Sequence, residues 1–63
     1  MKTYTREQYN SIPFFMKSPV TKEWIEESNL PKEYLGKTAI LVEGEKIGVS
    51  YWIFEGVDFE IVS

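Results

Sequence analysis

The stretch Thr38–Phe54 constrains the fold more than any other part of this chain. Its sequence, TAILVEGEKIGVSYWIF, is rich in β-branched and aromatic residues and is interrupted by the turn-forming segment 43–46. It therefore predicts a hairpin with strands at Thr38–Val42 and Ile47–Ile53. The GVDFEIV that follows reads as a third strand, so residues 37–63 are predicted to form a three-stranded antiparallel β-meander.

Gly44 determines the predicted pairing of the first two strands. A glycine at the first central position suits a two-residue type II′ loop. That loop pairs Val42 with Ile47 and sets Glu43 opposite Lys46, which is a favourable cross-strand pair of charges.

Gly56 determines the second turn. A left-handed Gly56 closes a three-residue loop, 54–56, and pairs Ile53 with Val57. The alternative two-residue loop, 55–56, would place Asp58 and Glu60 on the apolar face of the sheet. Because a slip of one residue reverses every side chain of a strand, the hydrophobic pattern favours the three-residue loop.

This register divides the predicted sheet into two unlike faces. One face is apolar and is expected to form the core; it holds Ile40, Val42, Ile47, Val49, Tyr51, Ile53, Val57, Phe59 and Ile61. The other face is mostly small or acidic; it holds Ala39, Leu41, Gly48, Ser50, Trp52, Asp58, Glu60 and Val62.

The N-terminal part, residues 1–36, is predicted to be helical or irregular. Thr5 and Gln8 have the spacing of a capping box, so a short helix is expected over Arg6–Ser11, ending before Pro13. Met1–Tyr4 is either a frayed end or a fourth strand.

A second helix is predicted over about Pro19–Ser28. Ser18 is its expected N-cap, Thr21 is the alternative N-cap, and Asn29 is a plausible terminator. Phe14–Met16 is interpreted as a connector that places aromatic side chains in the core. The predicted fold is thus α+β: one or two short helices packed on the meander, in a single domain of residues 1–63.

The composition limits how so short a chain can be stabilised. A domain of this size buries only about 60% of its unfolded surface. Cysteine and histidine are both absent, which excludes disulfides and Cys/His zinc sites, and no metal or cofactor is expected. Ten aromatic residues leave packing as the main source of stability, and dimerisation would be another way to enlarge the core.

The chain has no apolar run long enough to span a bilayer, and its start lacks the apolar segment of a signal peptide. We therefore expect a cytoplasmic location and no membrane partner. The small size and the Lys/Glu/Ile/Tyr-rich composition are compatible with an accessory protein of a bacterium or phage.

The charge is distributed unevenly along the chain. The net charge is −3; residues 1–42 carry six basic and five acidic side chains, and residues 43–63 carry one basic and five acidic ones. Nucleic-acid binding requires clustered positive charge to displace counterions from the phosphates. The acidic strand region therefore argues against a nucleic-acid binder.

Trp52 is the strongest candidate for a functional residue. The predicted register places it on the wetter face, where an aromatic side chain surrounded by polar groups is typical of a protein-binding anchor. Its expected neighbours in a partner-binding surface are Ser50, Asp58, Glu60, Glu43 and Glu45. The alternatives are structural: the N-terminal arm or the first helix covers Trp52, and the acidic residues are ordinary charges on a solvated edge strand.

These features predict a small, non-enzymatic protein-interaction module, such as an inhibitor or accessory protein that docks through an acidic, tryptophan-centred sheet face. Asp58 and Glu60 could pair as carboxylates, but the usual general base and thiol nucleophile are missing, so no enzyme is expected. One alternative is a homodimer with a structural or regulatory role that uses the same face. A small nucleic-acid binder is the third hypothesis.

Overall fold

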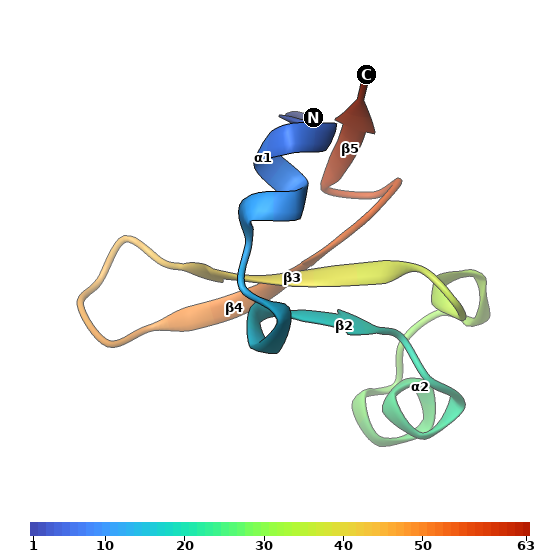
Figure 1. The fold of residues 1–63 in the computed structure, drawn as a ribbon. Coiled ribbons are helices and arrows are strands. Elements are labelled where there is room, and N and C mark those ends of the chain that lie inside the picture. Colours follow the sequence, from blue (N-terminus) through green and yellow to red (C-terminus); the bar gives the residue numbers. More distant parts are fainter.

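The computed structural model describes residues 1–63 and combines short helices with five strands. Along the chain, the elements are β1 (Lys2–Thr5), α1 (Arg6–Ser11), η1 (Phe14–Met16), β2 (Lys17–Pro19), α2 (Lys22–Ser28), η2 (Lys32–Tyr34), β3 (Thr38–Glu43), β4 (Ser50–Phe54) and β5 (Phe59–Val62). The two η elements are single 3₁₀ turns. The α+β class predicted from the sequence is therefore confirmed (Figure 1).

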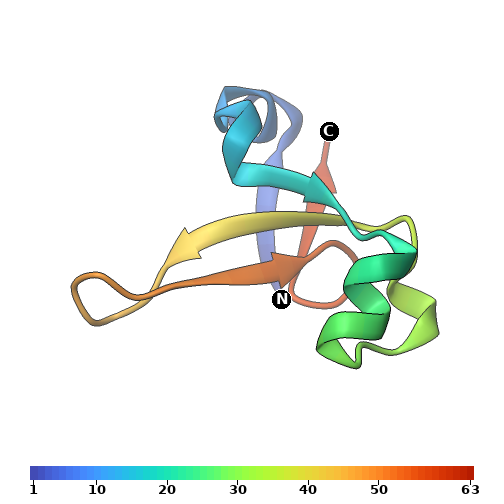
Figure 2. The same cartoon turned by 90° about the horizontal axis from the view of Figure 1, so that it is seen from below.

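The strands form two separate sheets. An antiparallel sheet has the order β2-β3-β4, and β1 pairs with β5 in a parallel pair. The three-stranded antiparallel sheet is thus confirmed, but its third strand is β2 and not the predicted segment 57–62. Met1–Tyr4 contributes a strand, as one alternative expected, although that strand pairs with β5. In Figure 2, β1 and β5 run side by side across the direction of β3 and β4.

The chain leaves the antiparallel sheet at the end of β4 because the backbone of Phe54 is already occupied. Its N–H donates to the Asp58 carboxylate at 2.9 Å, and its C=O accepts from the N–H groups of Val57 and Asp58. Gly56 has a φ of 82°, so the left-handed conformation predicted for it is confirmed. The turn directs β5 away from β4, which makes the predicted pair Ile53–Val57 wrong.

The hairpin register also differs from the prediction. Val42 pairs with Tyr51 instead of Ile47, a shift of four residues along β4. The loop spans residues 44–49, and its positive φ of 83° lies at Gly48. Val49 N–H donates to Lys46 C=O at 3.2 Å, so Gly48 occupies the third position of a type II turn. The two-residue loop at Gly44 is therefore wrong.

Local signals predicted the helices well. The capping box at α1 is present, with Gln8 N–H donating to Thr5 Oγ1 and the Gln8 side chain accepting from Thr5 N–H. In α2, Thr21 is the N-cap and Asn29 ends the helix in the left-handed conformation. The predicted start at Pro19 is wrong, because Ser18 and Pro19 belong to β2. Proline is tolerated there since β2 is an edge strand.

The main core lies on one face of the antiparallel sheet. Ile40, Ile53 and Phe59 are buried, and Tyr4, Tyr9, Ile12, Val42 and Ile61 pack against them. These residues come from β3, β4, β5, β1, and α1 with its C-cap Ile12, so the parallel pair and the first helix cover this face (Figure 1). The predicted apolar face is correct for these strand residues. It is wrong for Ile47, Val49, Tyr51 and Val57, which the longer loop and the new path of β5 leave exposed.

Phe14 and Phe15 take no part in the core. Their side chains are 89% and 79% exposed, whereas Met16 is half-buried. The prediction that this segment places aromatic side chains in the core is wrong. The turn η1 precedes β2 directly and lies close to β2 and β3, with both phenylalanine side chains directed to solvent.

Phe59 joins the two sheets, and its truncation is expected to unfold a large fraction of the molecules. Phe59→Ala should lower the free energy of unfolding by about 3–5 kcal/mol, because it removes a fully buried ring that contacts Tyr4 edge to face. The whole domain should have only about 3–9 kcal/mol. Urea denaturation followed by circular dichroism measures the loss. The control, Val62→Ala in the same strand, should cost less than about 1 kcal/mol, and equal losses would contradict this account of the core.

Candidate functional site

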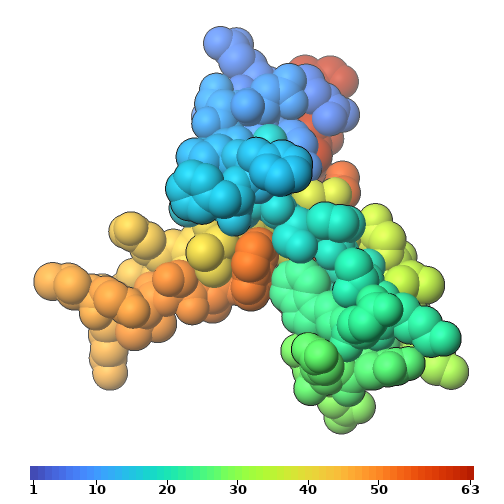
Figure 3. Space-filling model, turned by 60° about the horizontal axis from the view of Figure 1, so that its bottom comes forward, coloured from blue at the N-terminus to red at the C-terminus, as the bar shows by residue number.

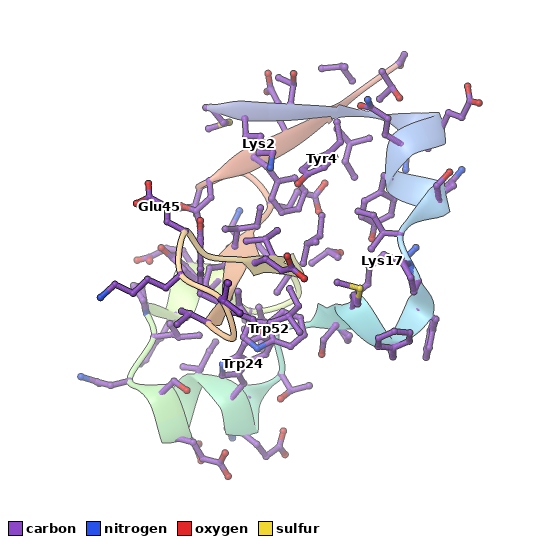
Figure 4. The ribbon with its side chains drawn as sticks, turned by 90° about the vertical axis from the view of Figure 1, so that its left-hand side faces the viewer. Lys2, Tyr4, Lys17, Trp24, Glu45 and Trp52 are labelled. Atoms are coloured by element: carbon purple, nitrogen blue, oxygen red, sulfur yellow. The ribbon has the colours of Figure 1, made fainter.

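Trp52 lies on the second face of the antiparallel sheet, the face covered by α2. Its ring meets that of Trp24 at a centroid distance of 5.2 Å and an interplanar angle of 73° (Figure 4). Phe54, on the same face, contacts Trp24 at 5.7 Å and Tyr34 at 5.0 Å. We call Trp24, Tyr34, Trp52 and Phe54 the aromatic cluster.

The aromatic cluster leaves Trp52 half-buried. The alternative that a helix folds over Trp52 is therefore closest to the structure, but the helix is α2 and neither the N-terminal arm nor α1. Trp24 in α2 and Tyr34 in η2 both contact Phe54, which is the cross-strand partner of the buried Ala39. Each face of the sheet thus has its own small cluster.

The structure brings together only part of the predicted acidic surface. Ser50 shares the face of Trp52, as predicted from the alternation of side chains. Its cross-strand partner on that face is Glu43, so the predicted pairing of Glu43 with Lys46 is wrong. Glu45 projects from the hairpin loop, apart from both tryptophans (Figure 4). Asp58 and Glu60 lie outside the antiparallel sheet altogether.

Asp58 has a structural contact within the chain. Its carboxylate accepts the N–H of Phe54 and thereby ends β4. Glu60 is exposed in β5, opposite Thr3 of β1. Asp58 is therefore held at the end of the strand that carries Trp52, whereas Glu60 belongs to the other sheet. No group of three or more acidic side chains is arranged to hold a metal ion.

The feature that sequence reasoning missed is the outer edge of β4. Hydrogen bonds join Glu55 to Thr38 and Gly44 to Val49, so the odd-numbered residues of this strand face β3. The N–H and C=O groups of Ser50 and Trp52 consequently point to the other side, where no strand follows (Figure 2). We call these four groups the open edge.

The open edge lacks the usual protection against pairing with another chain. Edge strands are commonly blocked by charged residues or proline. The opposite edge of the sheet, β2, contains both Lys17 and Pro19, whereas β4 reads SYWIF and carries no charge. Tyr51 and Val49, on the face of the main core, are 51% and 49% exposed. The absence of charge in SYWIF could have indicated this edge, but the predicted third strand was expected to cover it.

No helix of the structure is long and apolar enough to cross a membrane.

The contact between Trp24 and Trp52 should appear as coupling between two substitutions. Trp24→Ala and Trp52→Ala are expected to show an interaction free energy of about 0.5–1.5 kcal/mol in a double-mutant cycle, because edge-to-face aromatic pairs add that much beyond buried area. Unfolding in urea supplies the four free energies. Trp24→Ala combined with Ile47→Ala, at the exposed tip of the hairpin, should be additive within about 0.5 kcal/mol. An uncoupled tryptophan pair would argue against the aromatic cluster.

The different positions of Asp58 and Glu60 give a second prediction. Asp58→Ala should lower the free energy of unfolding by about 1 kcal/mol, because Phe54 N–H loses its acceptor. Glu60→Ala removes an exposed side chain and should change stability by less than about 0.5 kcal/mol. Thermal and urea unfolding of the two variants measure the difference. A loss at Glu60 as large as that at Asp58 would show that the hydrogen bond is not the cause.

No family model, curated protein or solved structure matches this chain.

Proposed function

We propose that this protein is a small, non-enzymatic protein-interaction module that binds an extended polypeptide segment along β4. The observation that supports this most directly is the open edge, with its free N–H and C=O groups at Ser50 and Trp52. Strand addition obtains affinity from such main-chain hydrogen bonds and specificity from the side chains beside them. An inhibitor or accessory protein could use this mode.

The side chains around the open edge suit a protein partner. Tyr51, Val49 and Ile47 are exposed along the hairpin and provide apolar contact area. Trp52 contributes its backbone, and Glu43 lies beside Ser50 on the other face. The binding surface proposed here is thus centred on the strand edge; the acidic, tryptophan-centred face is one flank of it.

Nucleic-acid binding and enzymatic activity receive less support from the composition of the chain. Glu43, Glu45, Glu55 and Asp58 surround the hairpin and its end, with Lys46 as the one basic residue of segment 43–63. Binding to nucleic acid depends on neutralising phosphates with Lys and Arg, so this surface favours a polypeptide ligand. The chain also contains no histidine or cysteine, the usual general base and thiol nucleophile of enzymes.

A photo-reactive residue at position 51 tests the proposal in the source cell. Tyr51 is replaced by benzoylphenylalanine, which keeps an aromatic side chain at the half-exposed position next to the open edge. Irradiation should give discrete adducts with one protein or a few, identified by mass spectrometry. Addition of Ser50→Pro should abolish them, because proline removes an N–H donor from the edge and is tolerated on edge strands.

The matched control carries the same photo-reactive residue at Phe15, which is exposed on η1, outside the hairpin. Adducts should be fewer there and should persist when Ser50→Pro is added. If position 51 gives no adducts beyond those of position 15, the open edge is not a protein-binding surface in the cell.

A further inference from the structure

We propose that the segment bound along β4 is β4 of a second copy of this chain, antiparallel to the first and related to it by a two-fold axis at Tyr51. This inference rests on the proposed function and specifies its partner. It joins two three-stranded sheets into one of six strands. The interface is isologous, as in most homodimers, since the same edge is used by both copies.

The backbone of β4 restricts the register of such a pair. Only Ser50 and Trp52 have outward N–H and C=O groups that are free, since those of Phe54 are bonded to Val57 and Asp58. An antiparallel pair uses all of the free groups when Ser50 of one copy lies opposite Trp52 of the other. The two copies then share four main-chain hydrogen bonds, and Asp58 marks the end of the pairing.

This register also places exposed apolar side chains against one another. Tyr51 lies opposite Tyr51 of the second copy as a non-hydrogen-bonded pair, the type in which side chains are closest. Val49 lies opposite Ile53 of the second copy on the same face. Tyr51 and Val49 are each about half exposed in the single chain, so the dimer covers surface that the fold leaves uncovered.

The surface of the single chain is large enough to supply such an interface. The accessible area is 4880 Å², whereas a compact protein of 7.4 kDa should expose about 4200 Å². The radius of gyration, 12.1 Å, also exceeds the roughly 10.6 Å expected for this length. Figure 3 shows the hairpin extending as an arm from the rest of the molecule. The excess over the whole molecule is about 700 Å², against roughly 800 Å² that each partner buries in a standard interface.

The distribution of charge is compatible with the antiparallel arrangement. The hairpin loop of one copy comes to lie toward the end of β4 in the other copy. That end carries Glu55 and Asp58, and the loop carries Glu45 next to Lys46, so the loop has no net charge. The arrangement therefore brings no net negative charge toward these carboxylates, and Lys46 is the cation nearest to them in sequence.

A single cysteine tests both the partner and the register, because the natural chain contains none. In Tyr51→Cys, the two Cα atoms at the two-fold axis should be about 4.5 Å apart, within the range that a disulfide can bridge. A glutathione redox buffer should therefore give a covalent dimer of the purified protein, measured by non-reducing electrophoresis and mass spectrometry. In the control, Val49→Cys, the equivalent atoms should be about 14 Å apart, and far less dimer should form. Equal yields from the two variants would overturn the register.

Sedimentation of the cysteine-free chain tests the association itself. The natural chain should form a dimer as its concentration rises from micromolar to millimolar. Ser50→Pro removes two of the four hydrogen bonds and should raise the dissociation constant about tenfold or more, whereas Ser50→Ala should leave it nearly unchanged. Circular dichroism verifies that both variants are folded. If Ser50→Pro unfolds, Tyr51→Glu replaces it: two carboxylates at the axis should weaken the dimer, and Val62→Glu should not.

The outcomes separate this inference from the proposed function. A natural chain that stays monomeric at every concentration overturns the dimer. If position 51 then cross-links to a different protein in the cell, the interaction module stands with another partner. If it cross-links to nothing, both proposals fall.

Discussion

Strand β3 is the element on which the rest of the structure depends, because it is buried from both sides. Ala39 and Ile40 are adjacent and point to opposite faces, yet they are 0% and 2% exposed. Ile40 belongs to the main core, and Ala39 lies beneath the layer that contains the aromatic cluster. A chain of 63 residues cannot fill one large core, so it divides its apolar side chains between two small clusters that share a central strand.

The path of the chain after β4 explains why this fold has an unpaired strand edge. The hydrogen bond from Phe54 N–H to the Asp58 carboxylate, together with the left-handed Gly56, directs β5 to β1. The parallel pair that results covers the main core. Because β5 pairs with β1, it does not pair with β4. Strand β4 therefore has β3 as its one neighbour, and its outer edge stays exposed. The turn at the end of β4 therefore accounts both for the covered main core and for the exposed edge of β4.

The two outer edges of the antiparallel sheet, β2 and β4, differ in their protection against pairing with another strand. Lys17 and Pro19 make β2 a poor template for another strand, and the Lys17 ammonium also lies 4.6 Å from the centre of the Tyr9 ring. Strand β4 contains neither a charged residue nor proline, and the Asp58 carboxylate blocks only its last residue, Phe54. The strand has an aromatic side chain on each face, Tyr51 and Trp52. A protein that avoided strand pairing would be expected to protect both edges. This asymmetry supports the proposed pairing along β4.

Local chemistry in the sequence determined the capped start of α1, the end of α2 at Asn29, the existence of β3 and β4, and the division of their side chains between two faces. Each of these depends on residues only a few positions apart or on simple alternation. The tertiary structure decided the hairpin register, the pairing of Lys17–Pro19 with β3, and the pairing of β5 with β1. A shift of four residues leaves every side chain on the same face, so the hydrophobic pattern could not distinguish the two registers. Which strand pairs with a given edge depends on contacts between distant parts of the chain. A local sequence pattern does not predict those contacts.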